Sequence, residues 1–268
     1  FTVSLSLSKA VYINVYHLYS ATRLRQAQAD NFCQVEKLNP HYTYFLILAA
    51  SLAGPLALSF DKKVAFYKSW KYLLPAMFIP ALLYIFWDIY FTSEGVWRFN
   101  EAYITGVKLI NLPIEEVLFF FIVPYCCVFI YACVRSYFPN LVNKKMADRI
   151  LQIIAVMLLI AGIIYFDKLY TGWTFIITGF FILTLYLFRE FFKGFDAVSF
   201  LISYAICLIP FLVVNGFLTA IPVVLYNDAE NLGIRIHTIP FEDVFYGMLL
   251  ILMNIVIYEK AKELSSKG

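Results

Sequence analysis

Two short acidic motifs are the residues of this sequence best suited to chemistry. The first reads Pro113-Ile114-Glu115-Glu116, and the second reads Pro240-Phe241-Glu242-Asp243. A proline suits the first turn of a helix, because its missing N–H would be unpaired there anyway. The two acids that follow then lie in the same first turn, where the helix dipole favours negative charge. Carboxyl groups positioned in this way can act as general acids and bases.

The two motifs belong to an internal repeat. Glu115 and Glu242 are 127 positions apart, and at this offset the match runs without a gap from Asp88/Asn215 to Phe119/Tyr246. Positions that are identical in both copies are Thr92/Thr219, Val96/Val223, Asn100/Asn227, Ala102/Ala229, Gly106/Gly233, Pro113/Pro240, Glu115/Glu242 and Val117/Val244. Such a repeat indicates one structural unit used twice. We therefore expect two copies of a helical unit, each with an acid pair.

The composition is that of an integral membrane protein. Hydrophobic residues make up 62% of the chain and charged residues 15%, whereas soluble domains carry roughly 45–50% apolar and about 25% charged residues. The net charge of +3 is too small to indicate a nucleic-acid partner. The cysteines show neither metal-site nor disulfide spacing, and four of the five lie in apolar runs where small packing residues are expected.

Seven apolar stretches are each near the roughly 20 residues that a bilayer requires. They cover 42–60, 70–91, 113–137, 148–166, 173–191, 198–219 and 239–259. The repeat maps the first three spans onto the last three. The fourth span lies between them, so the second copy crosses the membrane in the same direction as the first. The predicted fold is an all-α integral membrane protein of seven transmembrane helices, arranged as two parallel three-helix repeats joined by a linker helix.

These spans predict a division of the chain into four parts. The first repeat covers 42–137, the linker helix lies in 138–172, and the second repeat covers 173–262. Residues 1–41 contain no apolar run long enough to span a bilayer. They are interpreted as an extramembrane arm or partly artificial sequence.

The distribution of basic residues predicts the orientation in a cell (inner, cytoplasmic) membrane. On one side the loops and ends hold Lys62, Lys63, Lys68, Lys71, Arg135, Lys144, Lys145, Arg149, Arg189, Lys193, Lys260, Lys262 and Lys267. The loops on the opposite side hold Arg98, Lys108, Lys168 and Arg235. Because cytoplasmic loops carry an excess of Lys and Arg, the C-terminus of this multi-pass protein is predicted to be cytoplasmic. The acid pairs then lie towards the outer leaflet.

Ionisable residues at membrane depth are costly and usually functional. The candidate catalytic residues are Glu115, Glu116, Glu242 and Asp243. Candidates for binding substrate or stabilising a cation are Phe119, Tyr246, Trp97, Tyr226, Phe217, Asp88, Asn100, Asn215 and Asn227. The two loop asparagines, at 100 and 227, are read either as plain turn residues or as residues that orient the acids, while Pro113 and Pro240 are structural.

The helical spacing favours one member of each acid pair. Glu115/Phe119 and Glu242/Tyr246 are i, i+4 pairs on one helix face. An aromatic ring beside an acid would suit a carbocation, because π-faces stabilise cations. We therefore expect both acid-bearing helices to face one shared cavity, with Glu115 and Glu242 pointing in. Which member of each pair donates a proton is left open, because adjacent acids titrate as a coupled set.

At the two acidic motifs the chain resembles the membrane lycopene cyclases of carotenoid pathways in bacteria, archaea and fungi, in the type that fuses two small subunits. The resemblance extends through Tyr42-Thr43-Tyr44, Asp61-Lys62-Lys63, Trp87-Asp88-Ile89-Tyr90, Gly95-Val96-Trp97-Arg98-Phe99-Asn100 and Asn215-Gly216-Phe217-Leu218-Thr219, and covers about residues 42–262. It implies a lycopene β-cyclase that converts lycopene to γ-carotene and then β-carotene. The implied reaction is an intramolecular cyclisation by acid and base, without net redox change, cofactor or metal. The implied partners are lycopene, γ-carotene and membrane lipid.

Two other readings stay open at this point. A prenyltransferase-like enzyme would require Mg²⁺ and release diphosphate, but Asn227-Asp228 is the only faint likeness to its acid-rich motifs. A non-enzymatic carotenoid- or lipid-binding protein is the second, although a retinal protein would need a lysine in span 239–259, which has none. No G-x-G-x-x-G fingerprint is present. Ring type, cyclisation at one or both ends, and assembly into a homo-oligomer are also left open.

Overall fold

A computed structural model of the chain describes residues 39–266. Within this part, seven helices are long and apolar enough to cross a membrane. They are α2 (Thr43–Leu58), α3 (Trp70–Ser93), α4 (Ile114–Tyr137), α5 (Lys144–Ile164), α6 (Leu169–Leu187), α7 (Ala197–Ala220) and α8 (Glu242–Ser265). The predicted all-α membrane fold is confirmed. The predicted N-terminal arm lies almost entirely outside the described residues.

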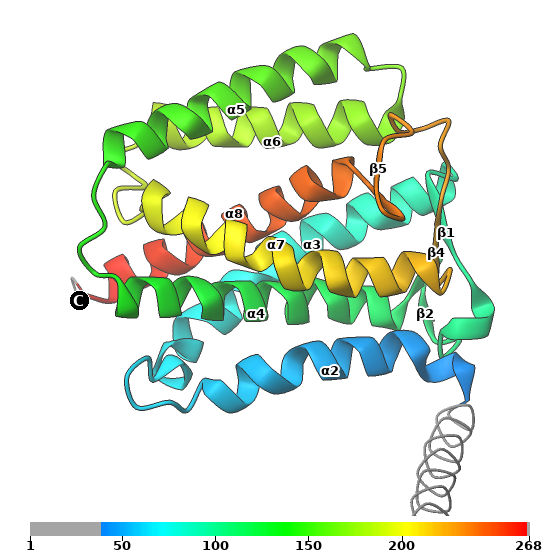
Figure 1. The fold of residues 1–268 in the computed structure, drawn as a ribbon, viewed down its shortest axis with the longest axis horizontal. Helices are drawn as coiled ribbons and strands as arrows, with labels where there is room; N and C mark the ends of the chain where they lie inside the picture. Colours follow the sequence, from blue (N-terminus) through cyan, green and yellow to red (C-terminus); the bar gives the residue numbers. More distant parts are fainter. Residues whose placement is uncertain (1–38, 267–268) are drawn as a thin grey trace, which may run out of the picture.

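The two three-helix repeats are interleaved. Within each repeat the first helix packs on the third, as α2 does on α4 and α6 does on α8. Between the repeats, the second helix of each packs on the third helix of the other, as α3 does on α8 and α7 does on α4. The linker helix α5 lies outside this group and packs mainly on α6 (Figure 1). A side chain at position 179 would collide with Ala155 of α5, so Gly179 permits this close approach.

Short strands follow the same repeat at one end of the bundle (Figure 1). They are β1 (Trp97–Phe99), β2 (Lys108–Leu109) and β3 (Leu112–Pro113), with counterparts β4 (Val224–Tyr226), β5 (Arg235–Ile236) and β6 (Ile239–Pro240). The β2–β3 and β5–β6 pairs are hairpins that lead directly into α4 and α8. The two acid-bearing helices therefore begin at the same end of the molecule.

An approximate two-fold axis relates the repeats and passes through the pair β1–β4. The strands are antiparallel, and Arg98 lies opposite Leu225, its own counterpart in the repeat. Just beyond the strands, the N–H of Asn100 donates to the carbonyl of Val223 at 2.9 Å. The N–H of Asn227 donates to the carbonyl of Val96 at 2.8 Å, which repeats the first bond with the partners exchanged.

Two differences from the sequence-based expectations lie near the acidic motifs. The fifth span begins at Leu169 instead of residue 173, so that Tyr170 and Thr171 belong to α6. The prolines of the motifs lie before the acid-bearing helices, because Pro113 ends β3 and Pro240 ends β6. Extended backbone at Pro113 (φ −57°, ψ 146°) ends the hairpin there and lets the helix start at the next residue.

Candidate active site

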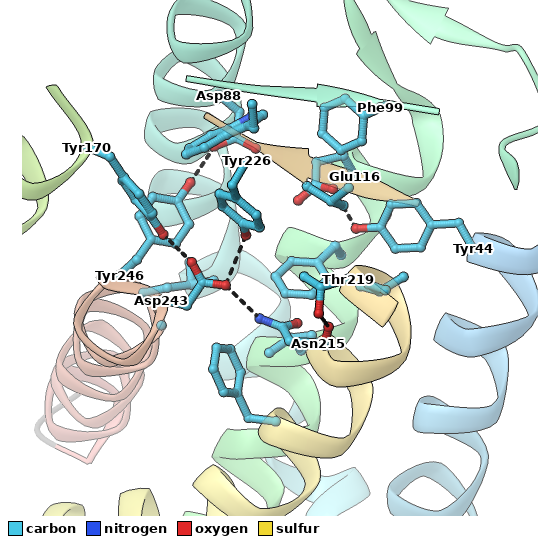
Figure 2. Close-up of a pocket in the computed structure, with 18 residues that line it drawn as sticks. Tyr44, Asp88, Phe99, Glu116, Tyr170, Asn215, Thr219, Tyr226, Asp243 and Tyr246 are labelled. Carbon is cyan, nitrogen blue, oxygen red and sulfur yellow. Dashed lines mark hydrogen bonds between the residues drawn. The ribbon is translucent and has the colours of Figure 1, made fainter. Parts of the chain in front are cut away.

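A cavity of about 50 Å³ lies at the strand end of the bundle, between the two repeats. Side chains from six of the seven spanning helices described in residues 39–266, and from both strands of the β1–β4 pair, line it. Figure 2 shows the labelled ones among them pointing toward one another. Its polar lining is made by Asp88, Glu116, Asp243, Asn215, Thr219, Tyr44, Tyr170, Tyr226 and Tyr246. Its apolar lining includes Trp97, Phe99, Phe119 and Phe211. The expectation that both acid-bearing helices face one shared cavity is confirmed.

Asp243 at the start of α8 is the most heavily hydrogen-bonded acid of the cavity. The phenol of Tyr170 donates to its Oδ1 at 2.5 Å. Its Oδ2 accepts from the phenol of Tyr226 at 2.9 Å and from the amide of Asn215 at 3.3 Å (Figure 2). Three donors around one carboxylate stabilise its negative charge, since hydrogen bonds to an ionised acceptor are the strong ones.

Tyr226 is a permanent donor in this network. It lies in β4, outside the spanning helices. Burial of its phenol raises its pKa well above 10, and the nearby Asp243 raises that pKa further. Because the phenol stays protonated at physiological pH, Tyr226 donates its hydrogen bond to Asp243 throughout that range.

Glu116 at the start of α4 has fewer donors. The phenol of Tyr44 donates to its Oε2 at 2.5 Å, and no other bond to this carboxyl group is formed within residues 39–266. The third acid, Asp88 of α3, accepts a bond from the phenol of Tyr246 (Figure 2). All three acids are at most 8% exposed. Three negative charges confined to so small a space would be very costly.

Glu115 and Glu242 do not face the cavity, which corrects the expectation for this pair. Glu115 Oε1 accepts from the backbone N–H of Thr105 at 2.7 Å. Glu242 Oε1 accepts from the N–H of Leu232 at 2.8 Å and from the hydroxyl of Thr171 at 2.6 Å. Both side chains are fully buried. They tie the helix start to the preceding loop in the same way in each repeat.

Helix geometry explains why Glu116 and Asp243, and not Glu115 and Glu242, can face the cavity. Residues at i, i+3 share a helix face as residues at i, i+4 do. Glu116/Phe119 and Asp243/Tyr246 are the i, i+3 pairs, and all four residues line the cavity. The bonds to the loop N–H groups hold Glu115 and Glu242 away from the cavity lining. Their identity in the two copies therefore reflects a shared structural bond.

The remaining candidates divide into two groups. Phe119, Tyr246, Trp97, Tyr226, Asp88 and Asn215 all line the cavity. Phe217 does not, because its side chain is 55% exposed on the outside of α7. Asn100 and Asn227 are turn residues, each accepting a bond from the backbone N–H two positions on at 3.1 Å. Pro113 and Pro240 are buried and end the hairpins.

Sequence reasoning missed the two tyrosines that hold the cavity acids. Tyr44 of α2 bonds Glu116, and Tyr170 of α6 bonds Asp243. The two tyrosines are 126 positions apart, one fewer than the offset that relates the acids. A comparison of the repeats that allowed a one-residue gap would have aligned them.

The cavity combines carboxyl groups, hydrogen-bond donors held in place, and the faces of aromatic rings. Together these groups suit proton transfer to and from an apolar substrate through a cationic intermediate. Within residues 39–266, no group of three or more His, Cys, Asp or Glu side chains is arranged to hold a metal ion.

Comparison with known proteins points to a single family. A model of the lycopene cyclase family matches residues 41–134 and again residues 167–261. The two matches correspond to the two repeats and leave out the whole of α5. Comparison with curated proteins and with solved structures found no match. Because the family model matches well over half of the chain, this membrane protein belongs to the lycopene cyclase family, whose members are carotenoid cyclases.

Proposed function

We propose that the chain is a lycopene β-cyclase, which closes the acyclic ψ-ends of lycopene into β-rings and forms γ-carotene and then β-carotene. The observation that carries the proposal is the pair of acids from equivalent positions, Glu116 and Asp243, in one cavity walled by aromatic rings. Family membership supports a carotenoid as the substrate. The reaction makes the enzyme an isomerase, because product and substrate have the same composition.

The chemistry requires one acid and one base for each ring. The acid adds a proton to the terminal double bond and leaves a tertiary carbocation. The neighbouring double bond attacks this cation, which forms the ring bond and moves the positive charge to a ring carbon. A base then removes the proton from the carbon that formed the new bond, and the ring double bond of a β-ring results. One proton is gained and one is lost, so no redox partner is needed.

The hydrogen bonds support a division of roles. Glu116 is assigned as the proton donor, because a single donor, Tyr44, stabilises its charged form. Asp243 is assigned as the base and as an anionic partner of the cation, because three donors surround it. Asp88 supplies a further acid, and its counterpart in the other repeat is the neutral Asn215, so the two halves of the cavity differ in charge.

The aromatic walls suit the intermediate. Phe119, Trp97 and Tyr246 line the cavity beside the acids. The face of an aromatic ring attracts a cation, and the attraction is larger where water is excluded. These rings cannot capture the cation by covalent attack as water would, so they also protect it.

We place the C-terminus in the cytoplasm and the cavity towards the outer leaflet, from the distribution of Lys and Arg between the loops. Reporter fusions at the C-terminus and in the loop at 138–143 would test this orientation. Both reporters should be active on the cytoplasmic side.

Expression of the full chain in lycopene-accumulating bacteria, followed by pigment chromatography, tests the proposed function. The expected result is conversion of lycopene to β-carotene, with γ-carotene as the intermediate. Unchanged lycopene, with the protein present in the membrane, would overturn the proposal. Formation of ε-rings would support the assignment as a cyclase, but it would show that the base removes its proton from a different carbon.

A further inference from the structure

The cavity is too small for a whole carotenoid. Pockets that enclose drug-sized ligands measure roughly 300–1,000 Å³, whereas the cavity measures about 50 Å³. A long polyene whose end reaches the acids must therefore lie mostly elsewhere. Two grooves of the surface within the spanning region are the candidates for that place.

The first groove is continuous with the cavity. It is formed by α2, α4 and α7, has a volume of about 240 Å³, and is called here the α2–α4–α7 groove. It shares Phe119, Val123, Phe211 and Asn215 with the cavity. Its other lining residues include Cys126, Cys207 and Pro210, and Pro210 is exposed in the middle of α7. Its mouth thus opens at membrane depth.

The second groove is the counterpart of the first under the approximate two-fold axis. It is formed by α3, α6 and α8, and its volume is about 670 Å³. Positions equivalent to Ser51, Cys126, Pro210 and Val214 hold Ile177, Met253, Leu83 and Trp87, respectively. Small residues in the first groove are thus replaced by large ones in this α3–α6–α8 groove.

An aromatic wall separates the α3–α6–α8 groove from the acids. None of its lining residues, all within 39–266, also lines the cavity. The phenol of Tyr84 donates to the backbone carbonyl of Tyr246 at 2.8 Å, and the two rings lie 4.7 Å apart. The ring of Trp87 packs 5.3 Å from that of Tyr246. The hydroxyl of Tyr246 is in turn bonded to Asp88, which holds the wall in place.

We propose that the α2–α4–α7 groove binds the polyene chain of the carotenoid and is the route by which its end enters the cavity from the bilayer. The proposal rests on the proposed carotenoid substrate. The groove is apolar except for Ser51 and Asn215, as a hydrocarbon requires. Since the equivalent route through the other repeat is walled off, the enzyme takes one end at a time, and the two ends of a symmetric substrate enter in succession.

A matched pair of variants tests the route. Cys126 and Met253 are equivalent, partly buried positions of α4 and α8. Cys126→Trp fills the α2–α4–α7 groove and should lower ring formation roughly 10²-fold, the loss that a misplaced substrate causes. Met253→Trp places the same indole in the α3–α6–α8 groove and should leave ring formation near the wild-type level. Equal activity of Cys126→Trp and wild type, at matched protein level, would overturn the proposal.

Thiol labelling gives a second test that requires no bulky variant. Wild-type protein in lipid vesicles is treated with a lipophilic maleimide, and labelling of Cys126 is read by mass spectrometry of its peptide. Lycopene should suppress the labelling, and lycopane, its fully saturated analogue with the same carbon skeleton, should suppress it far less. Equal suppression by both hydrocarbons would mean that the groove binds any lipid. No suppression would mean that lycopene does not enter the groove. Either result overturns the proposal. Absence of any ring formation by the wild type would instead be a failure of the proposed function.

Discussion

The phenol of Tyr44 donates a hydrogen bond to the carboxyl group of Glu116 across the interface between α2 and α4, at 2.5 Å. Tyr170 does the same for Asp243 between α6 and α8. The first helix of each repeat thus orients the acid at the start of the third. The two acids differ in their other partners, because Asp243 is also bonded by Tyr226 and Asn215.

This difference predicts unequal effects of removing the two phenols. Tyr44→Phe leaves Glu116 without its only donor within residues 39–266, so the acid loses its fixed orientation. Tyr170→Phe leaves Asp243 with two donors. We expect Tyr44→Phe to lower the cyclisation rate about 10-fold or more, since geometry controls proton transfer, and Tyr170→Phe to have a smaller effect. Rates in membranes, at equal protein level, measure this, and a larger loss in Tyr170→Phe would contradict it.

A second prediction concerns stability at the loop before α4. Glu115→Ala leaves the N–H of Thr105 without its acceptor, and an unpaired buried donor costs about 1–3 kcal/mol. Glu115→Gln retains an oxygen at this place and should cost less. Thermal unfolding of the purified protein, followed by circular dichroism, measures the difference.

The control for that prediction is Glu101→Ala. Glu101 pairs with Lys108 at the surface, and its side chain is 64% exposed. Exposed ion pairs contribute about 0–1 kcal/mol, so this variant should unfold close to the wild type. If Glu115→Ala were no less stable than Glu101→Ala, the hydrogen bond from Thr105 would not contribute to the stability of the fold.

Proton transfer by carboxyl groups predicts that turnover does not depend on a divalent metal. Treatment of the membranes with EDTA should leave the rate of ring formation unchanged, because the acids themselves supply and remove the proton. Loss of activity with EDTA, followed by recovery with Mg²⁺, would favour a prenyltransferase-like reaction instead. Diphosphate release is the confirming assay for that alternative.

The overall fold could be predicted because its signals are long-range and redundant. Seven apolar runs of the right length identify the spans, and the gapless match between the repeats relates the end of the second helix and the start of the third in each copy. The start of α6 was harder to locate. Thr171 and Gly172 look like loop residues, yet they lie inside the helix, where small and hydroxyl-bearing residues serve packing and bonding between membrane helices.

Which member of each acid pair faces the cavity could not be predicted from the residue spacing. The residues at i, i+3 and i, i+4 both share a face with the acid, so the pattern allowed either member. The choice depends on the loop N–H groups of Thr105 and Leu232, which are ten residues before the acids and have no side-chain signature. The β1–β4 pair was likewise hidden, because three-residue strands are too short for a periodic pattern.

We propose that Glu116 and Asp243 transfer the protons, while their neighbours Glu115 and Glu242 hold the loops. Glu116→Gln and Asp243→Asn keep the shape of each side chain but cannot exchange the proton, and a positioned acid or base contributes about 10²–10⁴-fold to the rate. Glu115→Gln and Glu242→Gln are the matched controls one position away.

The most direct measurement is the pigment composition of lycopene-producing cells that express each of these four variants, with protein levels equalised by immunoblot. We expect lycopene to persist with Glu116→Gln and with Asp243→Asn, and β-carotene still to form with Glu115→Gln and with Glu242→Gln. Normal β-carotene from both Glu116→Gln and Asp243→Asn, with loss in the Glu115 and Glu242 variants, would contradict it.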